Sequence, residues 1–129
     1  MNRESARELL MQLLFQMEGQ HDYSEGLKNR YLDEATGTRN QLSYINDLFE
    51  KVTANLEIID NIIDNNSNQW RVTRIPKVDL AILRLAIAEM MYADDIPKEV
   101  SINEAVNLAK KFSTEESGRY INGILSKVI

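Results

Sequence analysis

The stretch PKVDLAILRLAIAEMMYA, residues 76–93, decides the fold of this chain. Apolar residues occupy every side of a helix drawn through it, and its only charged residues are Lys77, Asp79, Arg84 and Glu89. A helix without a polar face packs in the middle of a bundle. Charged side chains on such a helix need explanation, and we expect internal ion pairs, helix ends or an interface. The segment predicts a central helix surrounded by others.

Helical periodicity continues on both sides of this central segment. Apolar residues recur every three or four positions in residues 3–17, 42–63, 101–112 and 113–128, and a weaker pattern covers residues 25–34. A change of phase at residues 53–55 predicts two helices, or one kinked helix, within residues 42–63. Gly19 is expected to end the first helix. Four residues stand three positions before a Glu or Gln, which is the spacing of a capping box, namely Ser5, Thr38, Ser101 and Ser113.

No segment shows sustained strand alternation. We therefore predict an all-α fold, a compact bundle of about six to seven helices. We find no linker, repeat or low-complexity region, so residues 1–129 are expected to form a single domain.

The composition excludes several classes of function. The chain has no cysteine, which rules out thiol catalysis, cysteine zinc sites and disulfides. Its one histidine, His21, lies in a polar stretch, where we expect a loop and no metal site. There is no glycine-rich phosphate loop and no nucleophile beside a base, so we expect no enzyme activity and no cofactor. No apolar run is long enough to span a bilayer, which favours a soluble, cytoplasmic protein.

The charge distribution bears on any nucleic-acid partner. The net charge is −5, which argues weakly against binding a polyanion. Residues 1–69 hold 6 basic and 12 acidic side chains, whereas residues 70–129 hold 9 basic and 8 acidic. A polyanion site would therefore have to combine the C-terminal half with the N-terminal arginines.

Some residues fall outside the apolar stripes and are candidates for binding. Met11 and Phe15 lie nearly opposite the centre of the first helix's apolar face. Phe15 could stack on a base, or it could pack against another helix. In the last helix Tyr120 lies at the edge of the stripe. Two glycines there, Gly118 and Gly123, fit either tight helix packing or a close ligand.

Three strings carry a resemblance to a known family. They are WRVTRIPKVDLAILRLAIAEM (residues 70–90), DDIPKEVSINEAVNLAKKFS (94–113) and ESGRYINGILSKV (116–128). Together they closely resemble the bacterial transcription antitermination factor family NusB, and RESARELLMQLLFQ (3–16) is similar to the first helix of that family. The resemblance runs essentially from end to end.

The resemblance implies an all-helical fold of two packed helical subdomains that works without catalysis. Members of the family bind the boxA element of nascent RNA, typically as a heterodimer with NusE, a small-subunit ribosomal protein. The complex joins other Nus factors at RNA polymerase, so that ribosomal RNA operons are transcribed past premature terminators.

The family's functional positions carry over residue by residue. The RNA contacts fall on Arg3, Arg7, Phe15, Glu116, Ser117, Arg119 and Tyr120, and the acidic position that faces NusE falls on Asp79. The N-terminus departs from the family, whose members often carry a denser basic run before the first helix, whereas this chain has only Arg3 and Arg7, interleaved with Glu4 and Glu8. Fewer phosphate contacts predict weak RNA binding by the chain alone, with NusE supplying much of the affinity.

Two alternatives differ in class. The same domain occurs at the N-terminus of certain ribosomal RNA cytosine methyltransferases, but no glycine-rich cofactor-binding domain follows in this sequence. The chain could instead be a protein-interaction module that self-associates as a homodimer and hides its RNA surface. Its apolar central helix and five methionines suit an interface as well as a core.

Overall fold

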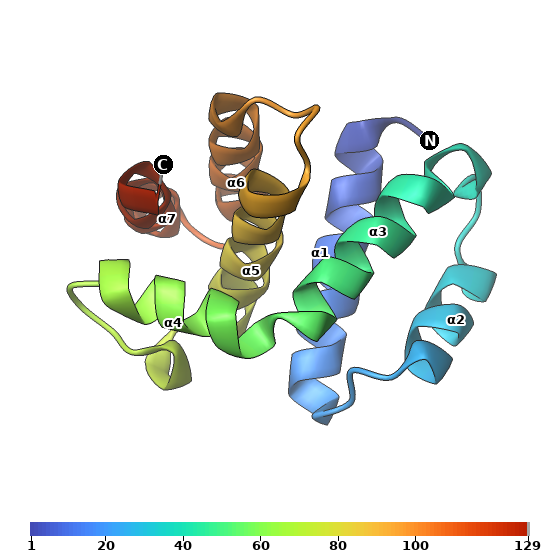
Figure 1. The fold of residues 1–129 in the computed structure, drawn as a ribbon, viewed down its shortest axis with the longest axis horizontal. Helices are drawn as coiled ribbons and strands as arrows, with labels where there is room; N and C mark the ends of the chain where they lie inside the picture. The colour runs from blue at the N-terminus through green and yellow to red at the C-terminus, as the bar shows by residue number, and fades with distance from the viewer. Residues whose placement is uncertain (129) are drawn as a thin grey trace.

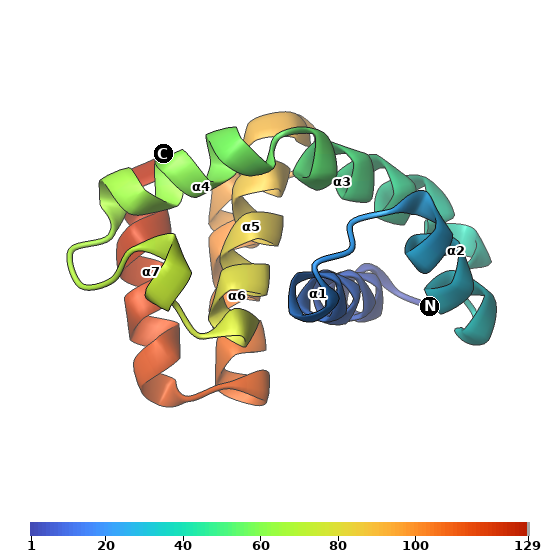
Figure 2. The same ribbon diagram turned by 90° about the horizontal axis from the view of Figure 1, so that it is seen from below.

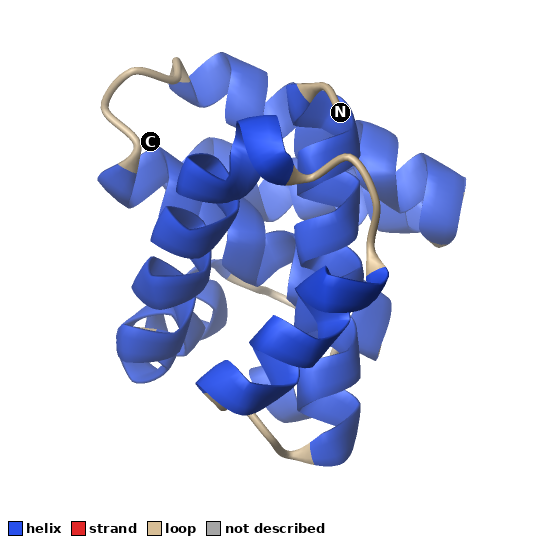
Figure 3. Ribbon diagram, turned by 90° about the vertical axis from the view of Figure 1, so that its right-hand side faces the viewer, coloured by secondary structure: helices blue, strands red, loops and turns tan. Residues whose placement is uncertain are grey.

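The computed structural model describes residues 1–128, which form seven α-helices and two short 3₁₀ turns without strands (Figure 3). The prediction of an all-α bundle of six to seven helices is therefore confirmed. The elements are α1 (Arg3–Gln20), α2 (Glu25–Glu34), η1 (Arg39–Gln41), α3 (Leu42–Ala54), α4 (Leu56–Asn66), η2 (Val72–Arg74), α5 (Lys77–Tyr92), α6 (Lys98–Phe112) and α7 (Glu115–Val128).

Helix α5 occupies the centre of the bundle, as its all-round apolar sequence predicts. Every residue from Asp79 to Met90 is buried. Helices α1 and α3 pack against α5 on one side, and α4, α6 and α7 pack against it on the other (Figures 1 and 2). The fold thus consists of two helical groups that share one core through α5.

The boundaries of α1 differ from the prediction at its C-terminus. The helix continues through Gly19 to Gln20 and ends at His21, which has a left-handed backbone with φ 52°. The His21 N–H bonds the carbonyls of Met17 and Glu18, as in a helix C-cap. Residue His21 therefore ends the helix, and Gly19 does not.

All four predicted capping boxes are misplaced. Thr38 makes no side-chain cap, and Ser5 lies inside α1, whose true N-cap is Asn2. Helix α6 begins three residues before Ser101 because Pro97 precedes its first turn. In α7 the cap is Thr114, one residue after the predicted Ser113, and its Oγ1 accepts from the Ser117 N–H at 2.9 Å.

Glu89 is the hub of a buried polar network. Its carboxylate accepts hydrogen bonds from Arg7 Nη2 at 2.8 Å and Arg7 Nε at 3.0 Å. Tyr44 Oη donates at 2.6 Å and Ser101 Oγ at 2.8 Å. Burial on its own would raise the pKa of Glu89, but these hydrogen bonds outweigh burial and lower it. The carboxylate is therefore ionised at neutral pH and joins α1, α3 and α6 to α5.

Arg84 forms the second polar junction, nearer the start of α5. Its guanidinium pairs with Glu18 of α1 at 2.6 Å and with Asp60 of α4 at 2.8 Å. Burial on its own would lower the pKa of Arg84, yet the bonds to Asp60 and Glu18 raise it. Internal pairing thus accounts for Arg84 and Glu89, two of the charges that the sequence left open.

We expect Glu89→Gln to destabilise the fold. The change leaves the Arg7 guanidinium buried beside a neutral amide, and breaking one half of a buried ion pair costs about 3–5 kcal/mol. Urea unfolding followed by circular dichroism measures the free energy of unfolding. Glu99→Gln, at an exposed position of α6, is the matched control and should change stability by less than about 0.5 kcal/mol. Equal stability of the two variants would contradict a structural role for Glu89.

Candidate nucleic-acid and partner interface

A pocket of about 330 Å³ opens where the first turns of α5 and α7 meet the loop between α4 and α5. We call it the Asp79 pocket, and its lining consists of Gln69, Trp70, Pro76, Asp79, Thr114, Glu116, Ser117 and Tyr120. The structure therefore brings together four residues that the family resemblance selected from distant parts of the sequence, namely Asp79, Glu116, Ser117 and Tyr120.

Asp79 lies at the base of this pocket with only 2% of its surface exposed. Its Oδ2 accepts a hydrogen bond from Ser117 Oγ at 2.8 Å, while its Oδ1 has no partner among the described residues. An unsatisfied buried acceptor costs about 1–3 kcal/mol, so native proteins rarely keep one without a reason. A donor supplied from outside the chain would remove this cost. The geometry thus fits a ligand or partner that brings an N–H group to Asp79.

The start of α7 orients Ser117 toward Asp79. Thr114 caps the helix and holds the Ser117 backbone, and the Ser113 hydroxyl lies 2.9 Å from Ser117 Oγ. Glu116 is exposed at the rim of the pocket. The Ser117 side chain therefore positions Asp79, while Glu116 remains free to meet a partner.

Two aromatic side chains form one wall of the pocket. The rings of Trp70 and Tyr120 meet edge to face, with centroids 5.1 Å apart and an interplanar angle of 62°. The Tyr120 hydroxyl lies 2.8 Å from Ser67 Oγ, and burial raises the Tyr120 pKa, which keeps the phenol neutral. Trp70 is 41% exposed. Such a half-exposed aromatic pair can stack on a nucleobase.

Arg119 and Lys127 provide positive charge on the neighbouring surface. Both line a shallower depression of about 170 Å³ that shares Gln69 and Tyr120 with the Asp79 pocket. Arg119 is exposed and lies outside the apolar stripe of α7, as predicted. The aromatic wall therefore separates an acidic pocket from a basic depression.

The predicted RNA contacts on α1 are dispersed. Phe15 is 43% exposed, as its position opposite the apolar face predicts, whereas Met11 is buried because α1 is covered on several sides by α2, α3 and α5 (Figure 2). Arg3 lines a different pocket, at the other end of α5. Arg7 is only 7% exposed and its guanidinium is held by Glu89. The geometry gives Arg7 a structural role, so we exclude it from the surface that can touch RNA directly.

The two glycines of α7 have different surroundings. A Cβ atom at Gly118 would lie 3.4 Å from the Lys110 side chain and 3.6 Å from Val106, which are ordinary van der Waals contacts with α6. Gly123 faces open space within 4 Å and lines the basic depression. A Cβ atom would therefore fit at both positions, and nothing in the structure requires glycine at residue 118 or 123.

Sequence reasoning missed Trp70 as a candidate residue. The available signal was a sole tryptophan directly after the polar run NNSNQ, where an exposed indole has no core to fill. Ser67 was missed as well, because its link to Tyr120 joins residues 53 positions apart.

The described part of the chain contains neither a metal-binding cluster nor a membrane-spanning helix. Within residues 1–128 no group of three His, Cys, Asp or Glu side chains could hold a metal ion. None of the helices in this range is both long and apolar enough to cross a membrane.

Comparison with known sequences identifies relatives over the whole length. Residues 4–129 match the sequence model of the NusB family. The transcription antitermination protein NusB of Acetivibrio thermocellus is 50% identical over 129 residues, which cover 100% of this chain and 89% of that protein. The NusB protein of Alkaliphilus oremlandii is 43% identical, covering 100% of this chain and 94% of its own.

Solved structures share the fold. A crystal form of Thermotoga maritima NusB superposes with a TM-score of 0.88 at 32% identity, covering 99% of this chain and 90% of that one. A chain in the crystal structure of antitermination factors NusB and NusE in complex with double-stranded RNA superposes with a TM-score of 0.86. That chain is 23% identical, with 98% and 94% covered, so its likeness concerns the fold.

We expect Asp79→Asn to raise the free energy of unfolding by about 1 kcal/mol. An amide oxygen can still accept from Ser117, and a neutral amide is less costly to bury than a carboxylate with one unsatisfied oxygen. Thermal and urea unfolding measure the change, with Glu116→Gln at the exposed rim as control. Destabilisation by more than about 1 kcal/mol would show that the carboxylate serves the fold of the free chain.

Proposed function

Because this chain belongs to the NusB family, we propose that it is a transcription antitermination factor that binds single-stranded boxA-type RNA together with NusE. In this role it joins the antitermination complex at RNA polymerase in the cytoplasm and promotes read-through transcription of ribosomal RNA operons. The family is one of non-enzymatic RNA-binding factors, so the chain acts by binding rather than by catalysis.

The observation that carries the proposal is the Asp79 pocket in a chain with full-length NusB relatives. Its buried carboxylate has one unsatisfied oxygen, and its rim displays Tyr120 and Trp70. The base of the pocket needs a hydrogen-bond donor, whereas its aromatic wall offers a stacking surface. These two features suit two different partners that bind side by side. We assign the donor to NusE and the aromatic wall to RNA.

The assignment of Asp79 to NusE follows from charge. An acidic position that is buried and short of one donor is best matched by an arginine, lysine or backbone N–H of a protein partner. RNA phosphates would be repelled by Asp79 and Glu116. The solved complex that contains NusB, NusE and double-stranded RNA supports the choice of partners, although it belongs to another protein.

The assignment of the aromatic wall to RNA rests on Tyr120 and on the two cations beside it, Arg119 and Lys127. An aromatic face with cations beside it is the usual platform for a single-stranded base and its phosphate. Phe15, exposed on α1, offers a second stacking surface.

The burial of Arg7 strengthens the prediction that RNA binding depends on the partner. Within α1 only Arg3 then remains as a cation near the surface, because the α1 sequence contains no other basic residue. Each lost phosphate contact lowers the RNA affinity. For a single strand it also makes the slope of log K against log salt concentration shallower by about 0.7.

The alternatives to this function gain no specific support. The matched relatives are named as antitermination proteins, which does not favour a methyltransferase fragment. Self-association as a homodimer remains a prediction of the sequence.

We expect the chain alone to bind boxA-like RNA weakly and with a shallow salt dependence, and the mixture with NusE to bind tightly. Fluorescence anisotropy of labelled RNA at two salt concentrations, with the chain, NusE and both, measures this. Tight binding by the chain without NusE would contradict the assignment. An RNA of scrambled sequence serves as the control.

We expect Tyr120→Ala to reduce RNA affinity by roughly 1–3 kcal/mol, because one stacking surface is lost. The fold should persist, since Tyr120 is only partly buried. Tyr31→Ala removes a comparably half-buried tyrosine from α2 and should leave RNA binding unchanged. If Tyr120→Ala lowers thermal stability and spares RNA affinity, Tyr120 is a packing residue.

A further inference from the structure

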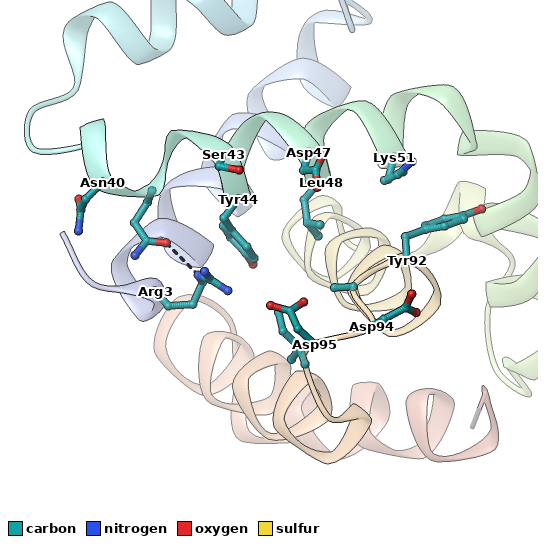
Figure 4. A pocket seen from close by; sticks show the side chains of 13 residues that line it. Arg3, Asn40, Ser43, Tyr44, Asp47, Leu48, Lys51, Tyr92, Asp94 and Asp95 are labelled. Atoms are coloured by element: carbon teal, nitrogen blue, oxygen red, sulfur yellow. Dashed lines mark hydrogen bonds between the residues drawn. The ribbon is translucent and has the colours of Figure 1, made fainter.

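A second pocket, of about 370 Å³, lies at the C-terminal end of α5 (Figure 4). It is bounded by the first residue of α1, by η1 and α3, and by the loop between α5 and α6. We call it the Arg3 pocket; the residues that matter here are Arg3, Tyr44, Asp47, Lys51, Asp94 and Asp95. Its volume falls in the range of small-ligand sites, which begins at about 300 Å³.

The cation of this pocket is fixed in place. Arg3 Nε donates to Gln41 Oε1 at 2.8 Å, and the guanidinium carbon lies 4.2 Å from the centre of the Tyr44 ring. The two terminal nitrogens of Arg3 make no hydrogen bond within residues 1–128. A guanidinium held by its Nε and its face has lost most of its freedom, so its remaining N–H groups are preorganised for an acceptor.

The carboxylates on the other side of the pocket also have free hydrogen-bonding atoms. Across the described residues Asp47, Asp94 and Asp95 take part in no ion pair and no side-chain hydrogen bond. The carboxylate of Asp95 points across the pocket toward Arg3, and Asp94 lies beside Tyr92 (Figure 4). The pocket therefore offers fixed donors on one side and free acceptors on the other.

This arrangement selects the chemistry of the ligand. Three carboxylates outnumber the two cations, Arg3 and Lys51, so a free phosphate is disfavoured. Within the described chain no cluster of acidic or histidine side chains can hold a metal ion. A basic peptide side chain would satisfy the carboxylates but has no acceptor for Arg3. The best match is one rigid group with acceptors and donors on neighbouring edges.

Guanine has this pattern. We propose that the Arg3 pocket binds a single unstacked guanine base of the RNA, with O6 and N7 accepting from Arg3, and N1–H and N2–H donating to Asp95. The proposal rests on the proposed RNA-binding function. Arginine pairs with these two guanine atoms more often than with any other base edge. Adenine has no N1–H, and uracil has no two adjacent acceptors. Cytosine has adjacent acceptors in N3 and O2 but only one donor group, N4–H2. Guanine alone therefore combines two adjacent acceptors with two neighbouring donor groups that can pair with both oxygens of a carboxylate.

A titration with nucleotides tests the pocket without RNA. The full chain, labelled with ¹⁵N, is titrated with the four ribonucleoside 5′-monophosphates. Guanosine monophosphate is expected to shift the amide resonances of residues 92–96 and 40–51 more than the other three, and Asp95→Asn should abolish the difference. Equal shifts by all four nucleotides, or shifts caused only by an oligolysine peptide, would overturn the proposal.

A thermodynamic cycle tests the same contact in RNA, with NusE present. Each guanine of a boxA-like single strand is replaced in turn by inosine, which lacks the N2 amino group. At one position, inosine should lower the RNA affinity of the unmodified chain about tenfold. At the same position it should leave the RNA affinity of the Asp95→Asn variant unchanged. Asp33→Asn, an exposed acid on α2, is the matched control and should respond like the unmodified chain.

Failure of the guanine site can be distinguished from failure of the proposed function. If the RNA does not bind at all, the proposed function fails, and the nucleotide titration still decides the pocket. If the RNA binds but inosine costs the same in Asp95→Asn and in the unmodified chain at every position, the guanine site is wrong and the proposed function stands.

Discussion

The buried pairing of Arg7 with Glu89 is the constraint on which the rest of the structure depends. Glu89 lies buried in the last turn of the apolar helix α5, where a bare carboxylate would be very costly, and it accepts hydrogen bonds from α1, α3 and α6 at once. Apolar packing has no preferred angle, whereas three directed donors fix how each neighbour sits on α5. The positions of both pockets follow, because the Asp79 pocket and the Arg3 pocket lie at opposite ends of α5.

Local pattern was sufficient to predict the helices and the central place of α5. Residues 76–93 are apolar on every side of a helix, which requires other helices all around them, and the structure buries every residue from Asp79 to Met90. Helix ends were harder to predict. Capping-box spacing occurs by chance in a polar chain. Helix α6 begins directly after Pro97, its N-cap residue, because a proline at a helix start has no N–H that needs a partner within the helix.

The candidate site could be predicted only in part, and for a physical reason. Four of the eight positions carried over from the family converge on the Asp79 pocket. Periodicity could not tell that Arg7 would be buried, since its partner is 82 residues away. The same limit applies to the missing donor at Asp79 and to the link between Ser67 and Tyr120. Burial and satisfaction of polar atoms are properties of the assembled bundle. They do not appear in any single stretch of the sequence.

The contact between Trp70 and Tyr120 has a practical consequence. Trp70 is the sole tryptophan of the chain, it is 41% exposed, and it lines the Asp79 pocket. Indole emission depends strongly on contact with water and on nearby quenching groups. The tryptophan fluorescence of this protein, excited selectively over that of its five tyrosines, therefore arises from one place, so that a partner which covers the pocket is visible without any attached dye. Binding confined to the far end of α5 has no tryptophan beside it, so a change in this emission reports on the Asp79 pocket.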